Sequence, residues 1–241
     1  MILEELMTAL TEEYSKPRQG IHVSDLTFCP RESCFRTLDP KPITNTQLNF
    51  FTSGKAIHEA LQSLIRKDPD RFELEKEVKY GDIVGHIDIF DKKYHIPIEA
   101  KSARVKTMTE PKAHYLKQLE AYMALTTSDT GIILVQCLLN NKENPFVEFE
   151  HTMTEDQRHE VLKQLERDAL QLKAGIMMGE QGPPLVRHIA YDTTLNWKCQ
   201  YCPYLKPCEA FRILERQDMF NNENENNKLL NELNDSVTNK V

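Results

Sequence analysis

Residues 83–101 read IVGHIDIFDKKYHIPIEAK, and this stretch decides the fold class. Apolar residues alternate with others over 83–90 and again over 94–101, which predicts two strands joined by the polar segment 91–93. Side chains two residues apart share one face of a strand, so Glu99 and Lys101 are expected to project together. An even-numbered turn, either Lys92-Lys93 or Asp91 through Tyr94, is expected to place Asp88 opposite Pro97 and on the face of Glu99. An odd number puts the two carboxylates on opposite faces.

The flanking sequence supplies the other elements of an α/β core. Helical spacing of apolar residues predicts helices over about 46–67, 110–125 and 154–176, and a capping box of Thr154 and Gln157 opens the last one. Alternation predicts a strand over 72–80 and an outer strand over 146–151. The apolar run 131–139 is typical of a central strand covered on both faces. The resulting order is helix, three strands, helix, strand.

The N-terminal part of the chain is expected to be helical. Apolar residues recur at helical spacing over 3–14, and Pro17 ends that helix. Ser24 with Asp25 indicates a helix cap, and Pro30 suits the first turn of a short helix.

Composition narrows the class of protein. The 241 residues are 40% hydrophobic and 28% charged, with few glycines and prolines, which excludes collagenous, wholly disordered and small disulfide-scaffold proteins. No apolar run approaches the roughly 20 residues needed to cross a bilayer. The first residues also lack the features of a secretory signal, so we expect a cytoplasmic protein without a membrane partner. The net charge of −7 argues against general coating of nucleic acid but is compatible with a local basic groove.

Two carboxylates and a lysine form the pattern that carries chemistry. Asp88 and Glu99 offer the hard oxygen ligands that Mg²⁺ or Mn²⁺ prefers, and Lys101 adds a cation that stabilises charge on a phosphate. This combination suits phosphodiester hydrolysis. Taken alone, the same spacing also fits a surface hairpin with ordinary exposed charges. Two further observations favour a site: Gln118 and Tyr122 lie four residues apart on the next helix, and a histidine lies in the helix before the strands.

These residues, in this order, resemble the RecB-type PD-(D/E)xK nuclease superfamily, and most of all its CRISPR-associated exonuclease branch. The resemblance implies a restriction-endonuclease-like αβββαβ core, with a mixed central sheet flanked by helices. It implies a Mg²⁺- or Mn²⁺-dependent DNA exonuclease that prefers single strands and trims DNA during CRISPR spacer acquisition, a step in antiviral defence. It also implies that Lys101 is catalytic and that Gln118 and Tyr122 contact DNA or support the site. The metal ligands that it implies are His58, Asp88, Glu99 and the carbonyl of Ala100. Ile87 stands where the motif has proline.

The cysteines indicate a second metal centre. Cys199, Cys202 and Cys208 form a tight cluster, and Cys29 lies far upstream. Four such thiolates hold either Zn²⁺ or a [4Fe–4S] cluster, and spacing alone leaves both open. The family resemblance favours the iron–sulfur cluster, acting as a clasp between the N- and C-terminal segments. Cys34 is an alternative ligand, whereas Cys137, in an apolar strand, is expected in the core.

DNA is the expected partner, as single strands or overhangs. Arg31 and Arg104 are candidate phosphate contacts or supports, although each also fits a solvated surface charge. The sequence contains no Gly-x4-Gly-Lys-Ser/Thr phosphate loop, so we expect no helicase motor. CRISPR integration proteins and further copies of the chain are candidate protein partners. The alternative functions are a DNA repair or viral recombination nuclease, a non-catalytic iron–sulfur DNA-binding subunit, and a zinc interaction module.

Four parts of the chain follow from these patterns. Residues 1–45 hold the N-terminal helices and the first cluster cysteine, and 46–178 hold the nuclease core with its flanking helix. Residues 179–216 form a linker and the C-terminal cysteine segment. Residues 217–241 are rich in Asn and Glu, and we expect this tail to be disordered.

Overall fold

The structure is a computed structural model, and it describes residues 2–15, 19–140, 144–183, 186, 199 and 201–208. The chain divides into two compact units, Met1–Trp197 and Lys198–Val241, and each is considered by itself. The division falls within residues 179–216, the part predicted to hold a linker and the C-terminal cysteine segment. The tail predicted over 217–241 lies outside the described residues.

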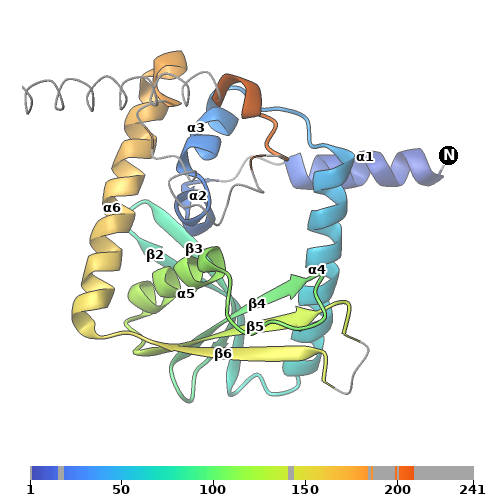
Figure 1. Ribbon diagram of the computed structural model, residues 1–241, viewed down its shortest axis with the longest axis vertical. Helices are drawn as coiled ribbons and strands as arrows, with labels where there is room; N and C mark the ends of the chain where they lie inside the picture. Colours follow the sequence, from blue (N-terminus) through green and yellow to red (C-terminus); the bar gives the residue numbers. More distant parts are fainter. Residues whose placement is uncertain are drawn as a thin grey trace, which may run out of the picture. The chain divides into compact units, whose positions relative to one another are not determined.

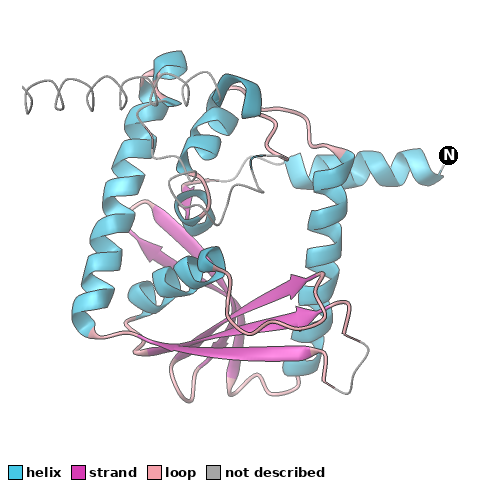
Figure 2. Cartoon of the chain, viewed as in Figure 1, coloured by secondary structure: helices cyan, strands magenta, loops and turns pink. Residues whose placement is uncertain are grey.

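The first unit is built on one mixed sheet of six strands (Figure 2). Its strands are β1 (Ile21–His22), β2 (Phe72–Tyr80), β3 (Ile83–Asp91), β4 (Ile96–Ala103), β5 (Thr130–Cys137) and β6 (Phe146–Thr152). The order is β1-β3-β4-β5-β6, with β2 also paired to β3. The β4–β5 and β1–β3 pairs are parallel and the others antiparallel, which confirms the predicted mixed α/β sheet. Two-residue β1 is too short to leave a sequence pattern.

The helices lie close to the predicted ranges. They are α1 (Ile2–Ser15), α2 (Val23–Thr27), α3 (Pro30–Leu38), α4 (Asn45–Ile65), α5 (Ala113–Thr126) and α6 (Glu155–Met177), followed by the short 3-10 helix η1 (Gly179–Gln181). Figure 1 shows α6 running alongside α5 and α3. No helix in the described part of the chain combines the length and apolar character that a membrane span requires.

The ends of three helices test the capping predictions. The capping box of Thr154 and Gln157 opens α6, as predicted. Pro30 occupies the first turn of α3, also as predicted. The assignment of Ser24 as a cap was wrong, because it lies inside α2, whereas Asp25 does take part in the cap as the third residue of that helix. His22 precedes that helix, and the backbone N–H of His22 donates a hydrogen bond to the Asp25 carboxylate at 2.9 Å.

The core lies between the sheet and the helices that cover one face of it. One apolar cluster joins α2, α3, α5 and α6 to β3, and a second packs α5 against β5. Ile133, Val135 and Cys137 of β5 are fully buried, whereas the residues between them are half-buried. The prediction that both faces of this strand are covered was therefore wrong for one face. Cys137 is a core residue, as expected.

Candidate active site

Two strands, β1 and β4, pair with different parts of one edge of β3, and the candidate site lies where neither of them pairs. Because β2 pairs with β3 along its length, β4 and β1 must share the other edge of β3. β4 pairs only with the segment from Ile89 to Asp91, and β1 only with Ile83 and Val84. Residues 85–88 therefore face an opening between β1 and β4. Strand ends and openings of this kind leave backbone groups available to ligands.

The β3–β4 register brings Asp88 and Glu99 to one face. Phe90 pairs with Pro97 and Asp91 with Ile96, so residues 92–95 form an even-numbered turn. The predicted parity is confirmed, because an even turn keeps both carboxylates on the same side. The predicted partner was wrong by two residues, since Pro97 lies opposite Phe90 and not Asp88. His95, the last residue of this turn, adopts a left-handed conformation, with φ of 58°.

Asp88 contacts one residue of β4 and one of α4. Its Oδ2 accepts a hydrogen bond from the Ala100 N–H at 2.8 Å, and its Oδ1 lies 3.4 Å from Nδ1 of His58 on α4. The N–H and C=O of one residue point to the same side of an extended strand. The Ala100 carbonyl is therefore directed toward the same opening as Asp88.

Glu99 is buried with one oxygen unsatisfied. Its side chain is 1% exposed, Oε1 accepts a hydrogen bond from Lys101 Nζ, and Oε2 has no hydrogen-bond partner among the described residues. Burial raises the pKa of Glu99, the nearby Asp88 charge raises it further, and together they bring it to about 7. A buried acceptor without a partner is costly, so this oxygen is a candidate ligand for a cation.

Lys101 is held by three groups. Its Nζ donates to Glu99 and, at 3.1 Å, to Gln118 Oε1, and it lies 5.7 Å from the centre of the Tyr115 ring. Burial lowers the pKa of Lys101, but the carboxylates of Glu99 and Asp88 raise it by more, so the pKa lies above its ordinary value. The lysine therefore stays charged at neutral pH.

Gln118 and Tyr122 support this lysine from α5. Gln118 Nε2 donates to the Tyr122 hydroxyl at 3.1 Å, which fixes the amide so that its oxygen faces Lys101. Both side chains are buried, which favours a supporting role over direct DNA contact. Gly85 makes room for the ring, because a Cβ at that position would lie 2.8 Å from Tyr122 Cε1.

His58 completes the set of predicted ligands. The hydrogen bond to Asp88 raises its pKa, burial opposes that rise, and the pKa remains above its ordinary value. The described residues hold no group of three His, Cys, Asp or Glu side chains already arranged as metal ligands. Hydrogen bonds from Lys101 and the Ala100 N–H already engage the carboxylates. The two carboxylates and the carbonyl nevertheless fit a hard divalent cation, to which the imidazole would add one softer nitrogen ligand.

The two arginines predicted near DNA differ in exposure. Arg31 is 2% exposed and its Nε donates to the Val186 carbonyl at 3.0 Å, so it supports α3 and is not placed to reach a phosphate. Arg104 is exposed, directly after β4 and three residues beyond Lys101. Of the four residues predicted to bind DNA or support the site, only Arg104 has an exposed side chain.

The cysteines fall in both units. In the first, Cys29 is buried and precedes α3, while Cys34 is fully buried in the apolar core. Burial raises the pKa of Cys34 to about 11, although the charge of Arg31 opposes the rise. A metal ligand must be a thiolate, so this raised pKa argues against Cys34 as the alternative ligand. In the second unit, the Cys202 N–H donates to the Cys199 carbonyl at 3.2 Å and the Cys208 N–H to Tyr204 at 3.0 Å.

Sequence reasoning missed Gln62 and Glu75. Gln62 is buried on α4, and its Nε2 donates to Glu75 Oε1 at 2.5 Å and to the Asp88 carbonyl at 3.3 Å. The spacing offered one signal, because Gln62 lies one helical turn after His58 and on the same face.

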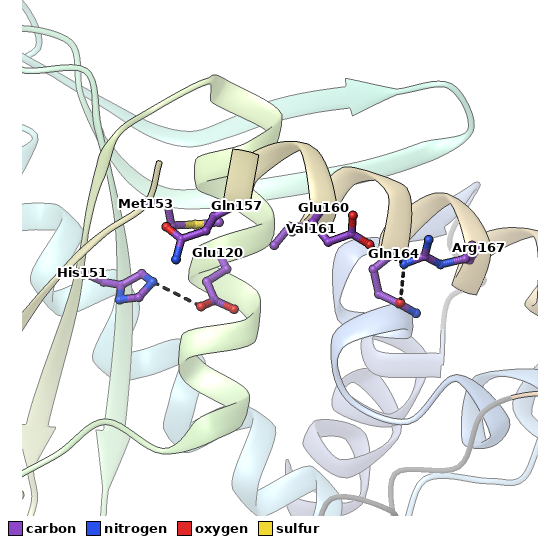
Figure 3. Close-up of a pocket in the computed structure, with 8 residues that line it drawn as sticks. All are labelled: Glu120, His151, Met153, Gln157, Glu160, Val161, Gln164 and Arg167. Atoms are coloured by element: carbon purple, nitrogen blue, oxygen red, sulfur yellow. Dashed lines mark hydrogen bonds and ion pairs between the residues drawn. The ribbon is translucent and has the colours of Figure 1, made fainter. Parts of the chain in front are cut away.

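A separate pocket lies between β6, α5 and α6 (Figure 3). Its lining residues are Glu120, His151, Met153, Gln157, Glu160, Val161, Gln164 and Arg167. His151 Nε2 lies 3.2 Å from Glu120 Oε1, and Arg167 donates to Gln164 at 2.9 Å. None of these residues belongs to the predicted site, so this pocket does not contribute to the chemistry of Asp88 and Glu99.

Comparisons with known proteins agree with this geometry. Residues 65–209 match the PD-(D/E)XK nuclease superfamily. Among solved structures, the crystal structure of SSO0001 is similar with a TM-score of 0.55 and 22% identity, covering 85% of this chain and 94% of that one. An alkaline exonuclease from Laribacter hongkongensis gives a TM-score of 0.47 at 14% identity, over 70% of this chain and 95% of its own. A phage-related exonuclease from Haemophilus somnus gives 0.42 at 14% identity, over 59% and 78%. No curated protein sequence matches.

Proposed function

Because the chain belongs to the PD-(D/E)XK nuclease superfamily, we propose that it is a metal-dependent DNA exonuclease acting preferentially on single strands. One observation carries the enzymatic part of this proposal. Buried Glu99 has an unsatisfied oxygen, lies near Asp88 and is hydrogen-bonded to Lys101. A buried carboxylate pair of this kind destabilises the folded protein unless it binds a cation, whereas ordinary surface charges would be solvated.

The residues have distinct roles in phosphodiester hydrolysis. A Mg²⁺ or Mn²⁺ ion would be held by Asp88, Glu99, the Ala100 carbonyl and His58. Such an ion would lower the pKa of a bound water molecule and neutralise charge on the phosphate. Lys101 carries a fixed positive charge at the same place, available to a phosphate oxygen or to the attacking water. Gln118 and Tyr122 hold that lysine in position, so its ammonium group does not have to move during the reaction.

The substrate preference rests on two observations. The motif order resembles exonucleases that act on single strands, and the sequence lacks the phosphate loop of a helicase motor. Exposed Arg104, next to β4, provides a charge for the DNA backbone. A strand that is already single, or an overhang, therefore suits this chain better than an intact duplex.

The process is CRISPR spacer acquisition, in which DNA is trimmed before integration, with CRISPR integration proteins as partners. Support for this assignment is the resemblance of the motif set to the CRISPR-associated branch. A DNA repair or viral recombination nuclease is the competing assignment. The length distribution of the products, measured with and without added integration proteins, distinguishes them, because we expect only a spacer-trimming nuclease to respond to those proteins.

We also infer a [4Fe–4S] cluster held by Cys199, Cys202 and Cys208, with Cys29 as the fourth ligand predicted from sequence. Support comes from the family resemblance, because the cysteine spacing alone also fits Zn²⁺. Anaerobically purified protein should be brown, absorb near 400 nm and contain about four irons per chain. Colourless protein with stoichiometric zinc would instead identify a zinc site.

Cleavage of end-labelled DNA tests the proposed function. The full chain should degrade single-stranded DNA with Mn²⁺ or Mg²⁺ and faster than blunt duplex, and EDTA should stop the reaction. Lys101→Ala should lower the rate at least about a hundredfold, because it removes a charge fixed next to the reacting phosphate. Lys79→Ala, at an exposed lysine of β2, is the matched control and should cleave normally. Unchanged binding of DNA without any metal-stimulated cleavage would support the non-catalytic subunit instead.

A further inference from the structure

Glu75 of β2 departs from strand conformation directly opposite Asp88. Its φ is 50°, in the left-handed region that residues with side chains rarely adopt. The β2–β3 pairs continue in one register before and after this point, yet none of those described joins Glu75 to Asp88. Backbone strain of this kind persists only where neighbouring contacts fix it, and it is frequent at functional sites.

The contact that holds Glu75 leads to the metal-binding residues. Its Oε1 accepts a hydrogen bond of 2.5 Å from Gln62 Nε2, and the same amide nitrogen lies 3.3 Å from the Asp88 carbonyl oxygen. Gln62 is buried, so its amide needs these partners. One amide on α4 is thus bound both to β2 and to the backbone of Asp88.

The same face of α4 carries His58, one helical turn before Gln62. His58 Nδ1 lies 3.4 Å from Asp88 Oδ1. Two contacts therefore join α4 to Asp88: one through the imidazole and one through the Gln62 amide. The second contact depends on Glu75 to orient the amide.

We propose that Glu75 is a positioning residue for the metal site, acting through Gln62 to fix α4 and its His58 against Asp88. The inference rests on the proposed metal-dependent nuclease function. Without the Glu75 carboxylate, the Gln62 amide loses one of its two acceptors and is free to rotate. The imidazole and the Asp88 carboxylate are then no longer held at a fixed separation before an ion binds. Outer-sphere supports of this kind typically change metal affinity by about 10–100-fold.

Calorimetric titration of the full chain with Mn²⁺ tests this role without relying on turnover. Glu75→Ala should weaken Mn²⁺ binding at least about tenfold, and Glu75→Gln should bind within about threefold of the wild type, because glutamine keeps an acceptor for Gln62. Glu77→Ala, at an exposed glutamate two residues along the same strand, is the matched control and should bind Mn²⁺ normally.

Glu75→Gly separates positioning from stability. Glycine adopts positive φ without strain, so this variant should unfold at a temperature no lower than the wild type while binding Mn²⁺ as weakly as Glu75→Ala. Wild-type Mn²⁺ affinity in both Glu75→Ala and Glu75→Gly would overturn the inference and leave the proposed function intact. A wild-type chain that neither binds Mn²⁺ nor cleaves DNA would instead overturn the proposed function.

Discussion

Metal binding should strengthen steeply with pH, because Glu99 must lose a proton before it can bind an ion. Burial and then the Asp88 charge raise the pKa of Glu99 from 4.5 to about 7. About one tenth of Glu99 is then ionised at pH 6 and about nine tenths at pH 8. The apparent affinity for Mn²⁺ should therefore rise about tenfold over this range. A carboxylate with its ordinary pKa would produce almost no change.

The free energy of unfolding of the metal-free protein should change in the opposite direction. A raised pKa in the folded state means that the contribution of Glu99 is fully present below pH 4.5 and is lost as the pH rises through about 7. The difference corresponds to about 3 kcal/mol. Added Mn²⁺ should offset this loss, so the rise in melting temperature caused by the metal should be larger at pH 8 than at pH 6.

Calorimetric titration with Mn²⁺ at both pH values measures the effect. His58 also has a raised pKa and adds a pH dependence of the same sign, so the decisive protein is His58→Gln, in which no histidine titrates at the site. This variant should bind Mn²⁺ more weakly than the wild type and still show the tenfold ratio. A ratio below about twofold in His58→Gln would refute the assignment of Glu99 as a buried carboxylate of raised pKa that binds the ion.

Three further predictions concern DNA binding, packing and the support of the catalytic lysine. Arg104→Ala should lower the slope of log affinity against log salt for single-stranded DNA by about 0.7, measured by fluorescence anisotropy; an unchanged slope would remove Arg104 from the DNA path. Gly131→Ala should lower the free energy of unfolding in urea by about 1–3 kcal/mol, because its Cβ would lie 2.7 Å from a methionine sulfur of α5. Gly54→Ala, where a Cβ meets open space on α4, should raise it by about 0.5–1 kcal/mol, and equal changes in both variants would contradict the packing described. Gln118→Ala should lower kcat about tenfold with unchanged affinity for DNA, since it frees Lys101; a loss of DNA affinity alone would make Gln118 a substrate contact.

Most helices and strands of the core were predictable from sequence because they have a strong local period. Alternation over 72–80 and helical spacing over 154–176 correspond to β2 and α6. The shared face of Asp88 and Glu99 depended only on the parity of a turn. The pairing itself was wrong by two residues, because no pattern in the sequence marks the residues at which the turn begins and ends.

Burial and long-range contacts were not predictable in the same way. Arg31 has the residue type of a DNA contact, yet tertiary packing buries it against Val186, far along the chain. Glu75 resembled any other charged residue of an alternating strand, and only its left-handed backbone and its bond to Gln62 distinguish it. Both features depend on how α4 packs against the sheet, which local spacing does not encode.

We propose that Asp88, Glu99 and the Ala100 carbonyl hold one divalent ion beside Lys101. Anomalous diffraction at the manganese edge, from crystals of the full chain grown with Mn²⁺, is the decisive measurement. We expect a manganese peak within about 2.0–2.4 Å of oxygens from these three residues. Crystals in which Mn²⁺ binds only elsewhere, with Glu99 still bonded to Lys101 alone, would contradict it.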